Sequence, residues 1–242
     1  MTRTERGSGA STPRVWAILP ALDEAEALPH VLADRPSGIG VLVVDNGSAD
    51  NTAEVARGFG VGVVVEERRG FGWACWRGAQ AATGAEVLVF LDADGSLDWD
   101  DLPAVAGPVL AGDADLVVGH RCRQRREPRS MPWHAVLANG VLAGLCGALA
   151  GTRLHDIGPY RAIRREVLLD LGMRDRTYGW PLEMVLRAGR RGLRILEVPV
   201  AYRHRAAGRS KVTGRPWATV KTAAKMGWVL LRHAATTRRG RR

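Results

Sequence analysis

Three short apolar runs in the N-terminal half of the chain each end in an acidic turn. They occupy residues 15–19, 41–44 and 86–91, and they lead into the acidic stretches 23–26, 45–50 and 92–94. Short runs rich in Val, Leu and Ile are typical of buried strands. Helix-like stretches follow the first two turns, so the repeated order of strand, acidic turn and helix predicts an open α/β sheet. The ligands of such sheets bind beyond the carboxyl ends of the strands.

The third run leads directly into Leu91-Asp92-Ala93-Asp94. Side chains two positions apart on a strand share a face, so Asp92 and Asp94 can direct both carboxylates at one point. Two hard oxygen donors suit Mg²⁺ or Mn²⁺, particularly when diphosphate oxygens complete the coordination. A solvated turn is the alternative, because Gly95 and Ser96 follow. Acidic groups at the other strand ends favour a metal–nucleotide complex, since carboxylates also accept hydrogen bonds from ribose hydroxyls and base N–H groups.

Several motifs occur together in a familiar order. The first half contains Pro20–Glu26, Val43–Asp50, Gly70–Ala74 and Leu91–Gly95, and the second half contains Asp156–Ala162, Glu197–Val200 and Gly208–Val212. Together they resemble a family-2 glycosyltransferase of the GT-A fold, and the second half is similar to the polyprenyl-phosphate branch of that family. The resemblance covers about residues 14–213. It implies an open mixed sheet flanked by helices in a single domain.

The resemblance also implies a set of functional residues. Metal ligands are expected at Asp92 and Asp94, and nucleotide-sugar contacts at Pro20, Leu22, Glu24, Asp45, Gly72, Asp92 and Ala93. Catalytic roles are expected for Asp94, Arg121 and Glu183. The donor would be a UDP- or GDP-hexose. Asp23 or Glu24 could instead serve only as a helix cap, which is a common use of such acids.

The loop before residue 73 contains Gly70-Phe71-Gly72. A glycine-rich turn that leads into a helix can let the backbone approach a phosphate-bearing ligand. The third glycine and downstream acid of a dinucleotide fingerprint are missing, so the sequence gives no support to a nicotinamide enzyme. We expect this loop to lie against the sugar nucleotide.

Basic residues are predicted to bind the acceptor phosphate. The resemblance places one arginine at Arg121 and another near Arg129, and Arg209 and Lys211 follow the strand expected near 194–202. Paired guanidinium–phosphate hydrogen bonds supply orientation as well as charge. A solvated basic loop is the alternative interpretation of each segment.

The role of Glu183 depends on the acceptor. Many inverting relatives keep a catalytic base at the matching position, and a hydroxyl acceptor would need one. A phosphate monoester has a second pKa of about 6 and needs little help, so Glu183 could then order Arg121 or a loop. A third metal ligand is also open, because Ser96 stands where related synthases often have Gln and Asp98 could substitute.

The chain is strongly basic, with 35 Lys and Arg against 25 Asp and Glu among 242 residues, a formal charge of +10. That balance predicts an anionic partner and leaves nucleic acid, a membrane surface or a phosphorylated substrate open. A nucleic-acid-binding module would explain the charge but not the acidic strand ends, which would face phosphate with the wrong sign. Cys75, Cys122 and Cys146 form no close pair, which fits a reducing, cytosolic setting without disulfides.

The expected organisation is a disordered tail at 1–13, one domain at 14–213, and a basic amphipathic helix with its tail at 214–242. Strands are expected near 14–19, 41–45, 62–66, 86–91, 115–119, 160–164 and 194–202, and helices near 24–34, 51–58, 73–83, 100–110, 133–150, 165–171, 180–190 and 215–233. The apolar run 135–151 is interpreted as a buried or interfacial helix, because it is marginal in length for a membrane span.

The leading hypothesis is an inverting, metal-dependent glycosyltransferase that moves a hexose to a polyprenyl phosphate. A transferase acting on a soluble hydroxyl acceptor is the alternative. The basic C-terminal segment predicts a cytoplasmic protein that associates peripherally with the inner face of an anionic membrane. The sugar, the base, the choice between Mg²⁺ and Mn²⁺ and the oligomeric state stay open.

Overall fold

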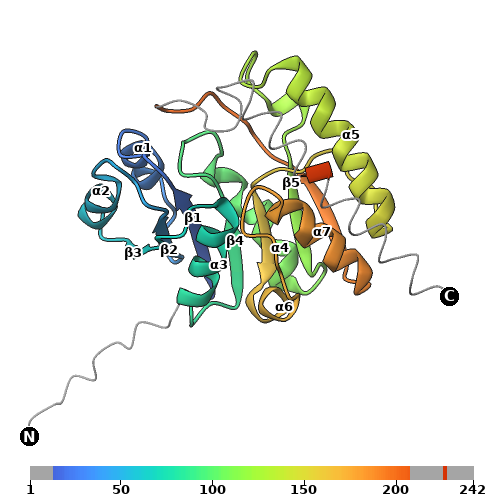
Figure 1. Ribbon diagram of the computed structural model, residues 1–242, viewed down its shortest axis with the longest axis horizontal. Coiled ribbons are helices and arrows are strands. Elements are labelled where there is room, and N and C mark those ends of the chain that lie inside the picture. The colour runs from blue at the N-terminus through green and yellow to red at the C-terminus, as the bar shows by residue number, and fades with distance from the viewer. Residues whose placement is uncertain (1–12, 208–225, 228–242) are drawn as a thin grey trace, which may run out of the picture.

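Seven strands of the computed structural model form one mixed sheet in the order β3-β2-β1-β4-β6-β5-β7 (Figure 1). The strands are β1 (Val15–Ala21), β2 (Gly40–Asp45), β3 (Gly62–Val65), β4 (Val87–Phe90), β5 (Leu116–His120), β6 (Arg161–Arg164) and β7 (Ile195–Pro199). The structure describes residues 13–207 and 226–227.

The strand directions bring the carboxyl ends of every strand except β6 to one edge of the sheet. Strand β1 is parallel to β2 and β4, while β6 is antiparallel to both β4 and β5. Strand β5 therefore runs in the same direction as β4, and β7 is parallel to β5. The expected open mixed sheet is confirmed, and the loops that follow β1, β2, β4 and β5 share the edge where such sheets bind ligands.

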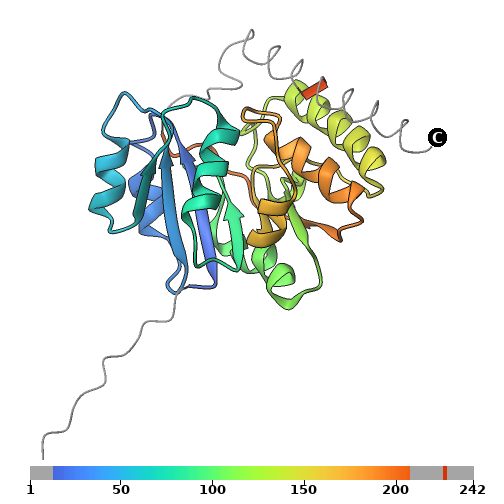
Figure 2. The same cartoon turned by 60° about the horizontal axis from the view of Figure 1, so that its bottom comes forward.

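Helices cover both faces of this sheet (Figure 2). They are α1 (Leu28–Ala33), α2 (Thr52–Gly58), α3 (Phe71–Ala81), α4 (Leu102–Ala111), α5 (Trp133–Ala150), α6 (Arg165–Asp170) and α7 (Trp180–Arg190), with short 3₁₀ turns η1 (Trp99–Asp101) and η2 (Arg123–Arg125). Successive strand residues alternate between the two layers. Ile18 packs in the cluster beneath α3, α5 and α7, whereas its neighbours Ala17 and Leu19 pack beneath α1, α2 and α4.

Most element boundaries agree with the sequence-based expectation within two or three residues, but α1 begins at Leu28 rather than near residue 24. The backbone N–H groups of Glu24 and Ala25 instead donate hydrogen bonds to the side chains of Thr52 and Asp50, which follow β2. The turn η2 was not expected. Of the helix predicted at 215–233, only Met226 and Gly227 are described, and Met226 packs against the cluster beneath α3, α5 and α7.

Helix α3 lies unusually close to the sheet at Gly78. A Cβ atom at this position would lie 2.3 Å from Ile18 Cγ2 and 3.0 Å from Val44 Cγ2. We expect Gly78→Ala to destabilise the fold by about 1–3 kcal/mol through overpacking, despite the better helix propensity of alanine. The free energy of unfolding in urea measures the effect.

The matched control is Gly144→Ala on α5, where an added Cβ meets nothing within 4 Å. That change should stabilise the protein by up to about 1 kcal/mol, because alanine favours the helix. Equal stability of wild type and the Gly78→Ala variant would show that the close contact does not constrain the fold.

Candidate active site

The loops after β1 and β2 hold each other at the carboxyl edge of the sheet. Asp45, the last residue of β2, is buried and accepts a hydrogen bond from the N–H of Ser48 at 2.9 Å. Ser48 Oγ in turn accepts from the N–H of Asp23 at 3.0 Å, and Asp23 accepts from the N–H of Ala49 at 2.7 Å. These reciprocal bonds hold Asp45 and the Asp23–Glu24 turn side by side before any ligand arrives.

Three carboxylates and one guanidinium meet where β4 ends. Asp94 is buried, and its Oδ2 lies 2.7 Å from Arg205 Nη1. Arg205 Nη2 lies 2.9 Å from Oε1 of Glu24, which is also buried. Burial, with the negative charge of Asp94, raises the pKa of Asp92 to about 7, while the charges of Arg121 and Arg205 act in the opposite direction. The three neighbouring carboxylates therefore need a positively charged group beside them.

The donor chemistry of this cluster fits a hard divalent cation. Asp92, Asp94 and Glu24 offer carboxylate oxygens only, and the guanidinium between two of them marks a point where a cation is stabilised. The sequence predicted Asp92 and Asp94 as metal ligands, and Glu24 as a nucleotide contact. It did not identify Arg205, whose importance depends on a contact between residues far apart in the chain.

Residues 203–206 lie along the loop that carries Asp94. The N–H of Ala206 donates to Asp94 O at 2.9 Å, and the N–H of Arg203 donates to Ser96 O at 2.9 Å. Asp98 pairs with Arg203 and accepts the N–H of Asp100 at the start of η1. Asp98 is thus paired with Arg203, and Glu24 is the carboxylate that shares the Arg205 guanidinium with Asp94.

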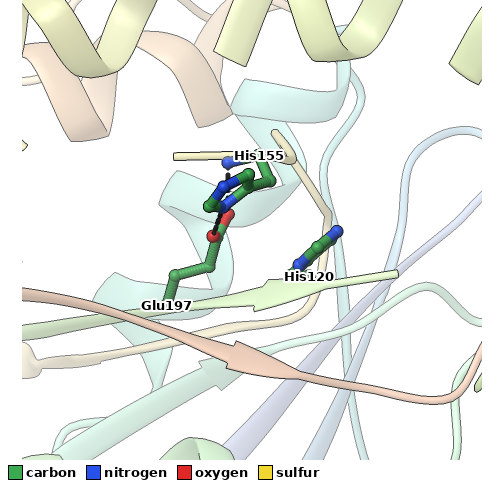
Figure 3. Close-up of side chains that lie close together, drawn as sticks. All are labelled: His120, His155 and Glu197. Atoms are coloured by element: carbon green, nitrogen blue, oxygen red, sulfur yellow. Dashed lines mark hydrogen bonds and ion pairs between the residues drawn. The ribbon is translucent and has the colours of Figure 1, made fainter. Parts of the chain in front are cut away.

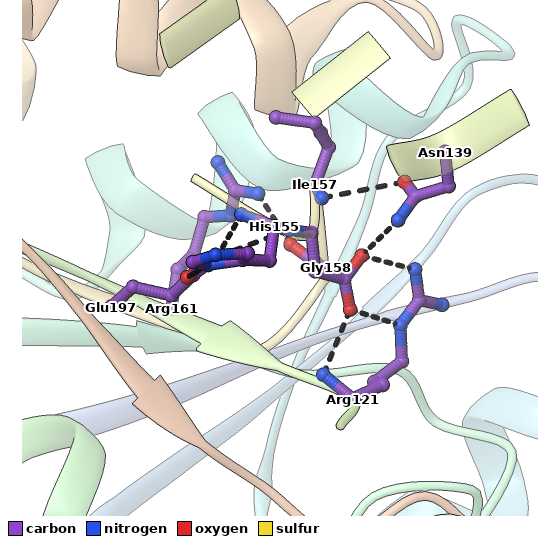
Figure 4. A network of polar contacts seen from close by, with 8 residues as sticks. Arg121, Asn139, His155, Ile157, Gly158, Arg161 and Glu197 are labelled. Carbon is purple, nitrogen blue, oxygen red and sulfur yellow. Dashed lines mark hydrogen bonds and ion pairs between the residues drawn. The ribbon is translucent and has the colours of Figure 1, made fainter. Parts of the chain in front are cut away.

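Arg121 follows β5 at the same edge and is fixed by Asp156 (Figure 4). Its Nε and Nη2 donate to the two carboxylate oxygens, each at 2.8 Å, and its backbone N–H donates to Oδ2, also at 2.8 Å. Burial acts to lower the pKa of Arg121, but the charge and hydrogen bonds of Asp156 outweigh it and raise the pKa further above its ordinary value. The guanidinium is permanently charged and held in one orientation.

Asp156 is itself positioned by a further set of contacts. Asn139 on α5 donates to its Oδ1, and the N–H of Asp156 donates to Glu197 Oε1 at 3.0 Å. Burial acts to raise the pKa of Asp156, but the charge and hydrogen bonds of Arg121, together with the hydrogen bond from Asn139, hold it below the usual range. The sequence suggested Asp156 and Glu197 as parts of motifs, whereas Asn139 had no recognisable signal beyond being a polar residue in an apolar run.

Glu183 has both carboxylate oxygens occupied. Oε2 accepts the N–H groups of Arg174 and Asp175 at 2.9 and 2.6 Å, and Oε1 accepts Nε of Arg187 at 2.7 Å. The side chain is buried at the N-terminal turn of α7, where it orders the loop before that helix. This arrangement favours the loop-ordering alternative over the role of a base.

Gly70 and Gly72, at the start of α3, approach the protein's own backbone. A Cβ at Gly72 would lie 2.8 Å from both Arg176 Cα and Asp175 O, and Gly70 has a φ of 150°. These glycines therefore let the start of α3 pack on the loop that Glu183 orders. Any contact of Gly72 with a sugar nucleotide stays a prediction.

Three of the remaining predicted residues lie at the same edge. Pro20 is the next-to-last residue of β1, Leu22 follows β1, and Ala93 is buried between the two aspartates. Arg129 is exposed, in a left-handed conformation with a φ of 61°, in the loop before α5. Arg209 and Lys211 lie outside the described residues.

Comparisons with known proteins place the chain among glycosyltransferases. The model of the family described as "Glycosyl transferase family 2" matches residues 16–172. An uncharacterized glycosyltransferase of Mycobacterium tuberculosis (strain H37Rv) is 45% identical over 203 residues, covering 83% of this chain and 90% of that protein. The polyprenol monophosphomannose synthase of Mycolicibacterium smegmatis is 32% identical over 238 residues, covering 87% of both chains.

A similar fold occurs in a solved structure. The glucosyl-3-phosphoglycerate synthase of Mycobacterium tuberculosis, in complex with Mn²⁺, UDP-glucose and phosphoglyceric acid, has a TM-score of 0.70 and 26% identity. The alignment covers 92% of this chain and 80% of that one.

Arg205 supplies the positive charge that a bound cation would also supply. We expect Arg205→Gln to lower the stability of the metal-free protein by about 1–3 kcal/mol, because it leaves the buried Asp94 carboxylate without a charged partner. The same change should tighten Mn²⁺ binding about five- to tenfold, since the competing charge is gone, equivalent to about 1–1.4 kcal/mol. Thermal unfolding in chelator and calorimetric titration with Mn²⁺ measure the two effects.

Arg203→Gln is the matched control, because Arg203 lies on the same segment but pairs with Asp98. Its Mn²⁺ affinity should equal that of the wild type. If the two variants bind Mn²⁺ alike, Arg205 does not compete with the cation.

Proposed function

Because the chain belongs to glycosyl transferase family 2, we propose that it is an inverting, metal-dependent enzyme that transfers a hexose from a UDP- or GDP-sugar to a polyprenyl phosphate. The observation that carries the proposal is the meeting of two kinds of group at one sheet edge. Carboxylates suited to a metal and a nucleotide lie beside an oriented guanidinium suited to phosphate.

The donor would bind along the ends of β1, β2 and β4. Asp45 and Glu24 would accept hydrogen bonds from the nucleoside, and Asp92 and Asp94 would hold Mg²⁺ or Mn²⁺. The bound cation would stabilise the negative charge of the departing nucleoside diphosphate. The complex of the M. tuberculosis synthase with Mn²⁺ and UDP-glucose, on the same fold, supports this assignment.

The state of Glu183 supports a phosphate acceptor. A general base needs an oxygen free to reach the proton that it removes. Both oxygens of Glu183 already accept hydrogen bonds from the chain itself. A phosphate monoester is largely dianionic near pH 7, since its second pKa is about 6, and can attack without a base. Arg121, held by Asp156, would orient that phosphate.

Helix α5 supports a lipid-linked acceptor. It is the one helix among the described residues that is long and apolar enough to cross a membrane, yet only 22% of it is buried. Trp133, Leu137, Val141, Leu145 and Leu149 are all exposed, at intervals of four residues. Helix α5 lies at the outside of the molecule (Figure 1), and it follows the basic loop 121–129 after three intervening residues. We propose that α5 contacts the membrane peripherally, with anionic headgroups near the basic loop.

Two relatives support the same acceptor class. The M. smegmatis enzyme is a polyprenol monophosphomannose synthase, and the undecaprenyl-phosphate mannosyltransferase of Micrococcus luteus is 32% identical over 222 residues. A soluble phosphorylated acceptor is the second candidate, favoured by the fold shared with glucosyl-3-phosphoglycerate synthase.

The proposal is tested by assaying transfer from a panel of UDP- and GDP-hexoses to polyprenyl phosphate and, separately, to phosphoglycerate. Wild type should form a polyprenyl-linked product that Asp94→Asn does not form. Arg121→Lys should lower kcat/KM for the acceptor by a factor of about 10–150, because lysine cannot form the paired hydrogen bonds of a guanidinium.

Arg123→Lys is the control, since Arg123 is exposed in the same loop. Transfer to phosphoglycerate alone, with any donor, would overturn the lipid-phosphate proposal in favour of the soluble one.

Membrane contact through α5 is tested by flotation with vesicles containing anionic lipid. Leu137→Glu with Leu145→Glu should reduce vesicle-bound protein at least tenfold, because two apolar side chains worth about 1.5–3 kcal/mol each on full burial are replaced by like charges. Val65→Glu with Leu196→Glu, two exposed apolar side chains on β3 and β7, is the matched control and should float like wild type. Equal flotation of both double variants would exclude α5 as the contact.

A further inference from the structure

Two histidines and a glutamate cluster together (Figure 3), and the two histidines directly precede Arg121 and Asp156 in the chain. His120 is the last residue of β5, Glu197 lies on the neighbouring parallel strand β7, and His155 lies in the segment before β6. One ligand atom from each lies within 4.8 Å of the other two. Three separate elements of the fold thus bring metal-binding groups to one place, and neither histidine has a role in the chemistry proposed above.

The geometry within the cluster is close to that of a metal site. His155 Nδ1 and Glu197 Oε2 are 2.6 Å apart, and the His120 ring is stacked on the His155 ring at a centroid distance of 5.4 Å. Zinc ligands lie about 2.0–2.2 Å from the metal, so a nitrogen and an oxygen on one tetrahedral ion are about 3.3 Å apart. A metal ion could take the place of the proton between His155 Nδ1 and Glu197 Oε2 if these two atoms moved apart by less than about 1 Å. A turn of the His120 ring would direct its nitrogen to the same point.

The glutamate is already oriented for such a role. Its Oε1 accepts the backbone N–H groups of His155 and Asp156 at 2.8 and 3.0 Å, which directs Oε2 toward the imidazole. Hydrogen bonds of this kind orient metal ligands in known sites. The exposed His155 side chain leaves the cluster open to solvent, so an ion can enter without unfolding.

We propose that His120, His155 and Glu197 bind a transition metal ion of the zinc class, with water completing the coordination. Two imidazole nitrogens and one carboxylate suit zinc, whereas Mg²⁺ prefers an all-oxygen site such as that of Asp92 and Asp94. His120 immediately precedes Arg121, and His155 immediately precedes Asp156. The bound ion joins the two segments that carry this ion pair and so stabilises the position of the arginine.

The test is calorimetric titration of the full chain with Zn²⁺ in excess Mg²⁺, which occupies the all-oxygen site and does not compete for imidazole. We expect one Zn²⁺ per chain, bound with a dissociation constant well below the millimolar range. X-ray absorption at the zinc edge should show imidazole scattering from two histidines. Zinc should also raise the unfolding temperature, because it binds the folded chain preferentially.

Two variants remove one ligand each while preserving the local packing. His155→Asn keeps a side-chain donor for Glu197, and His120→Phe keeps a ring to stack on His155. Each should weaken Zn²⁺ binding at least tenfold, since loss even of an outer partner typically weakens binding about 10–100-fold. His30→Ala, on α1, is the control histidine and should bind Zn²⁺ like wild type. Circular dichroism and Mn²⁺ binding verify that each variant is folded.

The proposal is overturned if His120→Phe and His155→Asn bind Zn²⁺ as tightly as wild type, or if the absorption spectrum shows oxygen ligands alone. Absence of binding to wild type below millimolar Zn²⁺ overturns it as well. None of these results bears on glycosyl transfer, which is measured with Mg²⁺ or Mn²⁺ and no zinc.

Discussion

The structure depends on the placement of several negative charges at one partly buried sheet edge. Burial, together with the negative charges of Asp94 and, to a smaller extent, Glu24, raises the pKa of Asp92 to about 7. Such a cluster is unfavourable unless cations accompany it. Arg205 supplies one within the chain, and the backbone of its segment is hydrogen-bonded to the loop that carries Asp94. The same charge requirement makes the edge suitable for a divalent ion and a nucleotide.

Arg121 is held by a second, separate network that reaches through the fold. Asp156 holds the guanidinium, Asn139 on α5 and the backbone of residue 121 hold Asp156, and Glu197 on β7 holds the backbone of residues 155–156. Orientation of this arginine therefore depends on three elements that do not touch the donor site. The proposed contact of α5 with a membrane would place one of those elements, through Asn139, at the lipid surface.

Sequence reasoning identified the parts of the site that are local in the chain. Asp92 and Asp94, Asp45 and Arg121 each follow a strand, so strand prediction alone placed them at one edge. It could not find contacts with remote partners. The start of α3 at Gly72 packs on the Arg176 backbone, and Asp98 pairs with Arg203. Glu183 was left between two roles, because only the fold shows that the loop at 174–175 occupies its carboxylate.

The order of strands, acidic turns and helices determined the α/β sheet and the edge at which it binds ligands, because hydrophobic periodicity and turn chemistry are local properties. Tertiary structure alone decided which charges meet. Arg205 reaches Glu24 across 181 residues, and His120, His155 and Glu197 converge from three elements. Such contacts follow from the sheet order and the antiparallel insertion of β6. No short-range pattern encodes them, because each depends on how distant segments pack.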